Sequence, residues 1–158
     1  MNRFLKTDEG SAVLMLQRLA LAAVMFPHGA QKLLGWYGGY GFSGTMGFFT
    51  GTLNIPAPIA LLVILGEAFG PLLLALGLFS RLAALGLTSI MLGAIFMSHA
   101  QYGFFMNWFG AQQGEGFEFH LLALALSVPL LIWGGGKASL DSVLARQAPR
   151  TAPRPATA

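Results

Sequence analysis

The sequence predicts an all-α polytopic membrane protein, a bundle of four transmembrane helices with both termini on the cytoplasmic side. Of its 158 residues, 55% are hydrophobic and 9% are charged, whereas a soluble domain carries about 25% charged residues. A chain so poor in charge calls for lipid as its solvent. A helix needs about 20 mostly apolar residues to cross a bilayer core of roughly 30 Å. Four segments qualify, and we expect helices over residues 12–34, 56–79, 82–99 and 117–133.

The connections between these segments differ in length. Only Ser80 and Arg81 separate the second from the third segment, which predicts a tight antiparallel hairpin. In the first long connection, residues 36–55, Phe42, Met46, Phe49 and Leu53 recur at helical spacing. That spacing gives one apolar face and predicts a short helix lying in the membrane interface.

The second long connection, residues 100–116, is rich in aromatic side chains, among them Phe105 and Trp108. Amphipathic rings suit the headgroup level of a membrane. We expect Phe105, Asn107 and Trp108 to form a lid over any cavity beneath this connection.

Orientation follows from the distribution of basic residues, because cytoplasmic loops carry an excess of lysine and arginine. One side of the predicted bundle holds seven of them: Arg3, Lys6, Arg81, Lys137, Arg146, Arg150 and Arg154. The other side holds only Lys32, at the edge of the first helix. The termini are therefore predicted to be cytoplasmic. We expect the membrane domain to cover residues 1–141 and a cytoplasmic tail to cover 142–158. A short surface helix is expected over residues 139–146, with Ser139 as its cap, and the tail should be disordered from about residue 148.

The chain contains no cysteine, which excludes disulfides, iron–sulfur clusters and thiolate metal sites. Its excess of positive charge is explained by topology, and no pattern indicates nucleic-acid binding.

Ionisable residues inside a membrane cost a few kcal/mol each and are therefore candidates for a functional site. Seven lie within or beside the predicted helices: Arg18, His28, Lys32, Glu67, His99, Glu118 and His120. Counting about 1.5 Å per residue from the cytoplasmic ends places all three histidines roughly 21–25 Å up, with Glu67 near 18 Å and Arg18 near 8 Å. The three histidines are thus predicted to share one level in the outer half of the membrane, with Glu67 just below them and Arg18 nearer the cytoplasmic side. Glu67 then needs a cationic partner or a proton, and Arg18 and His28 are the possible partners.

A structural interpretation competes with this one, since helix bundles in lipid also use polar side chains to bond across helices. Three ligands suit these side chains. They are a haem between two histidines, a zinc ion on three histidines and a carboxylate, and a quinone. A quinone demands less geometry than the other two, since its head group needs only a hydrogen-bond donor in an apolar, aromatic-walled cleft. We expect no metal site, and a haem is disfavoured.

The order and spacing of several motifs resemble those of the DoxX family over nearly the whole chain, about residues 14–141. The motifs are Arg18 with His28-Gly29-Ala-Gln-Lys32-Leu33 and Gly35; Gly66-Glu67, Leu76-Gly77 and Arg81; His99 with Gly103-Phe104-Phe105-Met-Asn107; and Gly116-Phe-Glu118, Gly134 and Ser139-Leu140-Asp141.

This resemblance implies a four-helix bundle in the bacterial cytoplasmic membrane. It also implies an association with redox chemistry, because related proteins take part in quinone-linked sulfur oxidation and in membrane complexes for redox-stress resistance. Our leading hypothesis is that the chain is a membrane subunit of a redox system. It would bind a quinone or similar lipid-soluble compound in a cavity in the outer leaflet. His28, Lys32, Glu67, His99, Glu118 and His120 would line this cavity and Arg18 would be a buried charge partner. The alternatives are a non-catalytic scaffold that recruits a soluble redox enzyme or stabilises a larger complex, and a small-solute transporter. The expected partners are the lipid bilayer and either a redox enzyme or further copies of the chain in a homo-oligomer.

Overall fold

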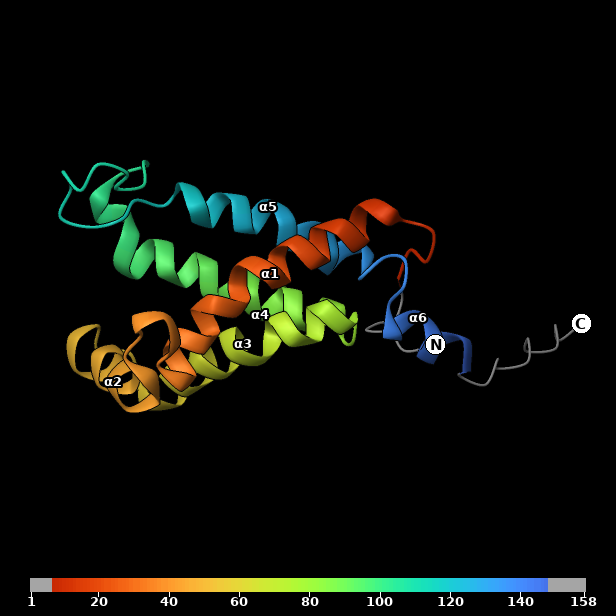
Figure 1. Ribbon diagram of the computed structural model, residues 1–158, viewed down its shortest axis with the longest axis horizontal. Coiled ribbons are helices and arrows are strands. Elements are labelled where there is room, and N and C mark those ends of the chain that lie inside the picture. The colour runs from red at the N-terminus through yellow and green to blue at the C-terminus, as the bar shows by residue number, and fades with distance from the viewer. Residues whose placement is uncertain (1–6, 148–158) are drawn as a thin grey trace, which may run out of the picture.

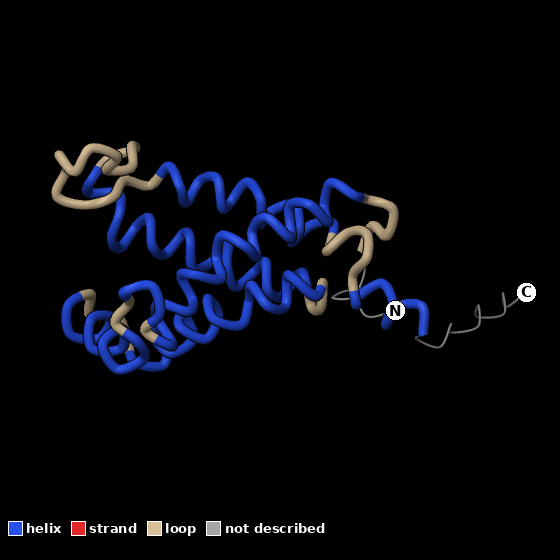
Figure 2. The backbone as a smooth tube through the Cα atoms, viewed as in Figure 1, coloured by secondary structure: helices blue, strands red, loops and turns tan. Residues whose placement is uncertain are grey.

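The described part of the chain, residues 7–147 of a computed structural model, consists of helices joined by turns and loops. Figure 2 shows this composition, with no strand among the described residues. The α-helices of this range are α1 (Ala12–Leu34), α2 (Gly41–Gly47), α3 (Ala57–Leu76), α4 (Ser80–Ala94), α5 (Glu118–Trp133) and α6 (Leu140–Gln147). The predicted all-helical class is therefore confirmed for these residues. The basic residues Arg3, Lys6, Arg150 and Arg154, and the tail from residue 148, lie outside them.

The four long helices run antiparallel to their sequence neighbours (Figure 1). Both long connections lie at one end of the molecule, which we call the loop end. The opposite end, which we call the terminal end, holds the start of α1, the turn between α3 and α4, and α6. Packing is most extensive between α1 and α3 and between α4 and α5. The bundle therefore consists of two closely packed helix pairs, α1 with α3 and α4 with α5, which diverge toward the loop end (Figure 1).

Within residues 7–147, three helical segments are long and apolar enough to cross a membrane: Ala12–Leu34, Ala57–Leu76 and Ser80–Tyr102. The fourth apolar helix, Glu118–Trp133, has 16 residues and is about 24 Å long at ~1.5 Å per residue. The chain is thus a membrane protein with several apolar helices, of which the last is the shortest.

The turn between α3 and α4 lies earlier than the sequence predicted. Helix α3 ends at Leu76, where Gly77 takes the left-handed conformation (φ 65°), and Ser80 already begins α4. The predicted connecting residues, Ser80 and Arg81, are thus helical. A left-handed C-cap is the usual role of glycine at a helix end. Phe79 also has a positive φ of 48°, which is uncommon for a residue with a side chain.

Asp141, the second residue of α6, stabilises this turn. Its two carboxylate oxygens accept hydrogen bonds from the backbone N–H groups of Phe79 (2.7 Å) and Ser80 (2.8 Å). These donors belong to the start of α4 and would otherwise be unsatisfied. The capping of α6 itself follows the sequence prediction, since Ser139 Oγ accepts from the Ser142 N–H. The α6 helix is therefore fastened to the terminal end of the bundle.

Helix α4 changes its winding near the loop end. A π-helical turn, Ile95–His99, follows Ala94 directly, and a 3₁₀ turn, Ala100–Tyr102, follows that. Such wide turns are rare and are found frequently at functional sites. The second histidine of the sequence, His99, lies at the end of this π-helical turn.

The first long connection folds into α2 and a second π-helical turn, Phe48–Thr52. Of the predicted apolar face, Phe49 is buried, and Met46 and Leu53 pack against the cluster that it forms with α3. Phe42 is 42% exposed. The helix is therefore held against α3 by the C-terminal part of its predicted face.

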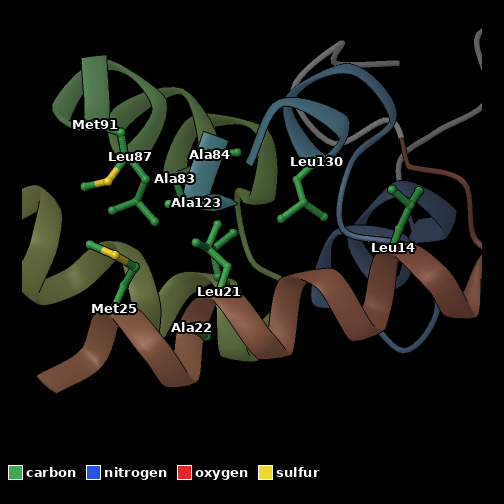
Figure 3. Close-up of a cluster of buried hydrophobic side chains, with 11 residues drawn as sticks. Leu14, Leu21, Ala22, Met25, Ala83, Ala84, Leu87, Met91, Ala123 and Leu130 are labelled. Atoms are coloured by element: carbon green, nitrogen blue, oxygen red, sulfur yellow. The ribbon is translucent and has the colours of Figure 1, made fainter. Parts of the chain in front are cut away.

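The main core lies where α1, α4 and α5 meet (Figure 3). Leu21 and Met25 of α1 point toward Leu87 and Met91 of α4, with Ala123 of α5 beside them. Several core positions on these helices are alanine, and small residues allow helices in lipid to approach closely.

Candidate functional site

A pocket of about 650 Å³ lies at the loop end, enclosed by residues of α1, α3, α4, α5 and the two long connections. Its volume falls within the roughly 300–1,000 Å³ of typical ligand sites. The walls are mainly apolar and aromatic, with methionines at positions 25, 91, 97 and 106 and the rings of Phe48, Phe49, Tyr102 and Phe119. The ionisable side chains that line it are His28, Lys32, Glu67, His99, Glu115 and His120. A few convergent polar groups in an apolar cavity are the usual composition of a small-molecule site.

An ion pair joins α1 to α3 in this pocket. The Lys32 ammonium lies 2.5 Å from Glu67 Oε2. The Glu67 side chain is 6% exposed and that of Lys32 is 26% exposed. A buried carboxylate needs such a partner to remain charged. The pair is therefore the partnership that the sequence analysis required for Glu67, made with Lys32 and not with Arg18 or His28.

Gly29 explains how these helices come close enough for this pair. A Cβ atom at Gly29 would collide with the backbone of Glu67 and Ala68 on α3. The glycine thus lets the two backbones touch, as small residues do at helix interfaces in membranes. Lys32 lies three residues further along α1 and so projects from nearly the same face as Gly29.

Four aromatic and imidazole rings form a continuous row across the pocket. The ring centroids of His28 and Phe119 are 5.5 Å apart, those of Phe119 and His120 are 5.6 Å apart, and those of His120 and His99 are 4.2 Å apart. The row joins α1, α5 and the end of the α4 segment. The three histidines, which the sequence predicted to lie at one level on three helices, thus belong to one row of rings.

The three histidines differ in their hydrogen bonds. His99 Nδ1 lies 2.8 Å from the backbone oxygen of Glu115. His120 is buried, and its Nδ1 atom has no hydrogen-bond partner in the part of the chain that the structure describes. His28 is half-buried and contacts the Phe119 ring. An unpartnered polar atom in a buried ring is unusual and marks His120 as a position of interest.

The second long connection is braced by its own side chains. The Asn107 side chain donates to the Gln112 carbonyl (3.0 Å) and accepts from the Gln112 N–H (2.9 Å), and the Asn107 N–H donates to Glu115 Oε2. Gly116 fits because a Cβ there would collide with the carbonyl oxygens of residues 103–105. This compact loop holds the Glu115 carbonyl against His99.

The predicted pocket residues divide into two groups. His28, Lys32, Glu67, His99 and His120 line the pocket, whereas Glu118 is not among its lining residues. Glu118 accepts a hydrogen bond from Trp108 Nε1 at 3.0 Å. The predicted lid residues Phe105, Asn107 and Trp108 do not line the pocket either, and Phe105 and Trp108 are exposed. They belong to the second long connection, and other residues of this connection, Tyr102, Met106 and Glu115, line the pocket instead.

Arg18 lies at the other end of the bundle and contacts neither Glu67 nor the pocket residues. Arg18 is 2% exposed, and within the described residues its guanidinium donates to backbone carbonyl oxygens alone. The acceptors are Gly135, Leu74, Ala75, Lys137 and Ala138, at 2.7–3.4 Å. All three guanidinium nitrogens are thus used. The side chain ties α1 to the end of α3 and to the segment after α5.

The sequence did not identify Glu115, whose carbonyl binds His99, or Asp141, whose carboxylate caps α4, as site residues. Glu115 lies in a glycine-rich loop, where no periodicity signals an inward position. Asp141 was noted only within the family pattern, and its target N–H groups are 61 and 62 residues away in the chain. Neither partnership leaves a local signal in the sequence.

The arrangement suits hydrogen bonding to a ligand better than metal coordination. Among residues 7–147 no group of three or more His, Asp or Glu side chains is placed to hold a metal ion. The His99 and His120 rings touch each other, so these two could not hold a haem iron between them. What the pocket offers is donors, acceptors and an ion pair within apolar walls.

Comparison with known proteins agrees with the resemblance seen in the motifs. The model of the DoxX family matches residues 13–100, more than half of the chain. A Haemophilus influenzae protein, described as uncharacterized, is 32% identical over 143 residues, which cover 89% of this chain and 89% of that protein. No solved structure matches the chain significantly.

Proposed function

The chain belongs to the DoxX family, and we propose that it is a membrane subunit of a redox system that binds a quinone or similar lipid-soluble compound. The binding site is the pocket at the loop end. The observation that carries this proposal is the composition of the pocket, in which histidines and an ion pair lie within walls of methionine and aromatic side chains. A quinone head group has oxygen atoms that accept hydrogen bonds, and its ring and tail require apolar surroundings.

Lys32 and the histidines supply the polar contacts. After its bond to Glu67, the Lys32 ammonium keeps further N–H donors, since an ammonium carries three. Phe119 stands between His28 and His120 in the row of rings, and a planar head group can stack on such a surface. Glu67 fixes the position of the lysine without itself being reachable from solvent, since its side chain is 6% exposed.

The mouth of the pocket supports entry from lipid. Among the lining residues, Phe48 is 46% exposed and Met97 is 50% exposed. Each lies on one of the two π-helical turns, Phe48–Thr52 and Ile95–His99. The other exposed lining residues are Thr52, Gln101 and Glu115, so the accessible rim is part apolar and part polar, as suits a compound with a lipid-soluble body and a polar head group.

We further propose that all four long helices cross the bacterial cytoplasmic membrane, with both termini in the cytoplasm and α2 at the outer interface. The described basic residues support this orientation, because Arg81, Lys137 and Arg146 lie at the terminal end and only Lys32 lies toward the loop end. Helix α5 is short, and local thinning of the bilayer or flanking residues can accommodate it. The pocket then lies in the outer leaflet.

A redox enzyme is the partner that this proposal requires, because oxidation or reduction of a bound quinone needs a second redox component to exchange electrons with it. In the rival function the chain is a scaffold for such an enzyme, and its polar core is only structural.

The test is organic extraction of the detergent-purified protein, followed by titration with a quinone. The wild-type protein should yield quinone or bind it, and His28→Phe and His120→Phe should each reduce the amount bound. Ser89→Ala is the matched control, because that hydroxyl is exposed and bonds only within its own helix. If the wild-type protein yields and binds no quinone, the proposed function fails. Undiminished binding in both histidine variants, with partner recovery intact, would favour the scaffold.

A further inference from the structure

We infer that His99 and His120 form a donor–acceptor pair that selects the reduced, hydroxyl-bearing form of a ring compound over its oxidised carbonyl form. This inference rests on the proposed function, since it specifies which redox form of a quinone-type ligand the pocket prefers. It follows from the hydrogen bonds that the two imidazoles make and lack.

The proton of His99 is placed by its partner. His99 Nδ1 lies 2.8 Å from the Glu115 carbonyl oxygen, and a carbonyl oxygen can only accept. Nδ1 must therefore carry the proton. In the neutral ring the other nitrogen, Nε2, is then an acceptor. Nε2 has no hydrogen-bond partner among the described residues, and the side chain lines the pocket.

The carbonyl that sets this tautomer is firmly held. The Glu115 carboxylate accepts from the Asn107 N–H at 2.5 Å. On the C-terminal side of Glu115, the backbone N–H groups of Gly116 and Phe117 donate to the carbonyls of Phe105 and Gly103, each at 3.2 Å. The acceptor for His99 is thus part of a closed loop, and the ring cannot exchange it easily for another partner.

His120 has the complementary arrangement. The residue is 6% exposed, and its buried Nδ1 atom has no hydrogen-bond partner among residues 7–147. A proton on Nδ1 would leave a buried N–H donor unsatisfied, which is rare in proteins. With the proton on Nε2, the buried atom is an acceptor lone pair, and unsatisfied acceptors are tolerated better. His120 lines the pocket, so its Nε2–H is a donor available to a ligand.

The two rings lie side by side, with centroids 4.2 Å apart. An acceptor on His99 and a donor on His120 are therefore offered to one region of the pocket. A ring hydroxyl satisfies both, because it donates one hydrogen bond and accepts others. A carbonyl or ether oxygen only accepts, so it satisfies His120 and leaves His99 Nε2 without a donor. Polar groups built to bond a hydroxyl discriminate strongly against analogues that lack it.

The experiment compares three probes of nearly the same shape: tetramethylhydroquinone, tetramethylquinone and the dimethyl ether of the hydroquinone. Each is titrated anaerobically into the full chain in detergent. The wild-type protein should bind the hydroquinone about tenfold more tightly than either of the others, the effect of roughly one hydrogen bond. His99→Phe should remove this preference. Ser89→Ala, at an exposed position that does not line the pocket, should retain it.

The outcomes separate the inference from the proposed function. Binding of none of the three probes overturns both. Binding of the quinone or the ether as tightly as the hydroquinone overturns the inference and leaves the proposed function standing. The wild-type comparison needs no variant, so a folding defect in His99→Phe does not affect it. NMR of isotope-labelled histidine gives a second readout, in which protonation at Nδ1 of His120 or at Nε2 of neutral His99 would contradict the inference.

Discussion

Lys32 on α1 and Glu67 on α3 form an ion pair at 2.5 Å within the pocket at the loop end. The contact joins the two most extensively packed helices of the molecule at the level where the ligand is proposed to bind. It therefore bears on both stability and binding, and the two contributions can be separated by substitution.

Removing the lysine alone should be worse than removing both charges. Lys32→Met leaves the buried Glu67 carboxylate without its cation, and we expect a loss of roughly 1–3 kcal/mol, less than for a fully buried pair because Lys32 is partly exposed. The double variant Lys32→Met with Glu67→Met should recover most of this loss, since apolar replacements of a buried pair are often neutral. Thermal unfolding in detergent measures the difference. Equal destabilisation by the single and double variants would show that the pair itself is not what matters.

Enlarging Gly29 should separate α1 from α3. In Gly29→Ala the new Cβ would collide with the backbone of Glu67 and Ala68, and backbone atoms cannot turn away as a flexible side chain can. We expect a loss of about 2 kcal/mol or more, typical of overpacking, together with weaker quinone binding. Gly86→Ala on α4 is the control, because its Cβ would meet nothing within 4 Å. That variant should be neutral or up to about 1 kcal/mol more stable, since alanine is the better helix former. Similar stability in the two variants would contradict this account.

Arg18 should tolerate no replacement, including lysine. Its guanidinium donates to five carbonyl oxygens that come from α3 and from the segment after α5. Lysine offers three donors from a single nitrogen and cannot reach the same five carbonyl oxygens. We expect Arg18→Lys to lose at least about 3 kcal/mol in thermal unfolding, because charged hydrogen bonds contribute about 1.5–3 kcal/mol each.

The comparison for Arg18 is Arg146, whose bond to Glu9 is exposed, with 68% of the arginine side chain accessible. Arg146→Lys should change stability by less than about 1 kcal/mol, as exposed pairs do. A mild effect at Arg18, comparable to that at Arg146, would show that the carbonyl contacts contribute little.

The proposed topology can be mapped directly, because the chain has no cysteine of its own. Gln113→Cys places a thiol in the exposed loop between α4 and α5, and Gln147→Cys places one at the exposed end of α6. A membrane-impermeant maleimide applied to intact cells should label the first and not the second. Labelling of the second alone would invert the proposed orientation, and labelling of both would mean that the two ends of the bundle do not lie on opposite sides.

The sequence by itself determined which segments are apolar helices, although the short turn between α3 and α4 lies a few residues earlier than predicted. The observed bounds of α1 are those of the predicted range, and α5 begins one residue later than predicted. This success has a simple cause, since apolar run length is a local property of the chain and reflects its solvent. The arrangement of three histidines near one end also followed from counting residues along antiparallel helices, because rise per residue is nearly constant.

Only the tertiary structure decided which side chains meet. Counting along a helix gives height, but the rotation of one helix against another depends on packing. Glu67 pairs with Lys32 because Gly29 lets α1 and α3 touch, and Arg18 reaches carbonyls that are 56 or more residues away in sequence. The turn at Gly77–Phe79 likewise depends on the distant Asp141 carboxylate. Such contacts arise from long-range packing, which no local pattern encodes, and for that reason the placement of Glu118 and Glu115 relative to the pocket became known only from the fold.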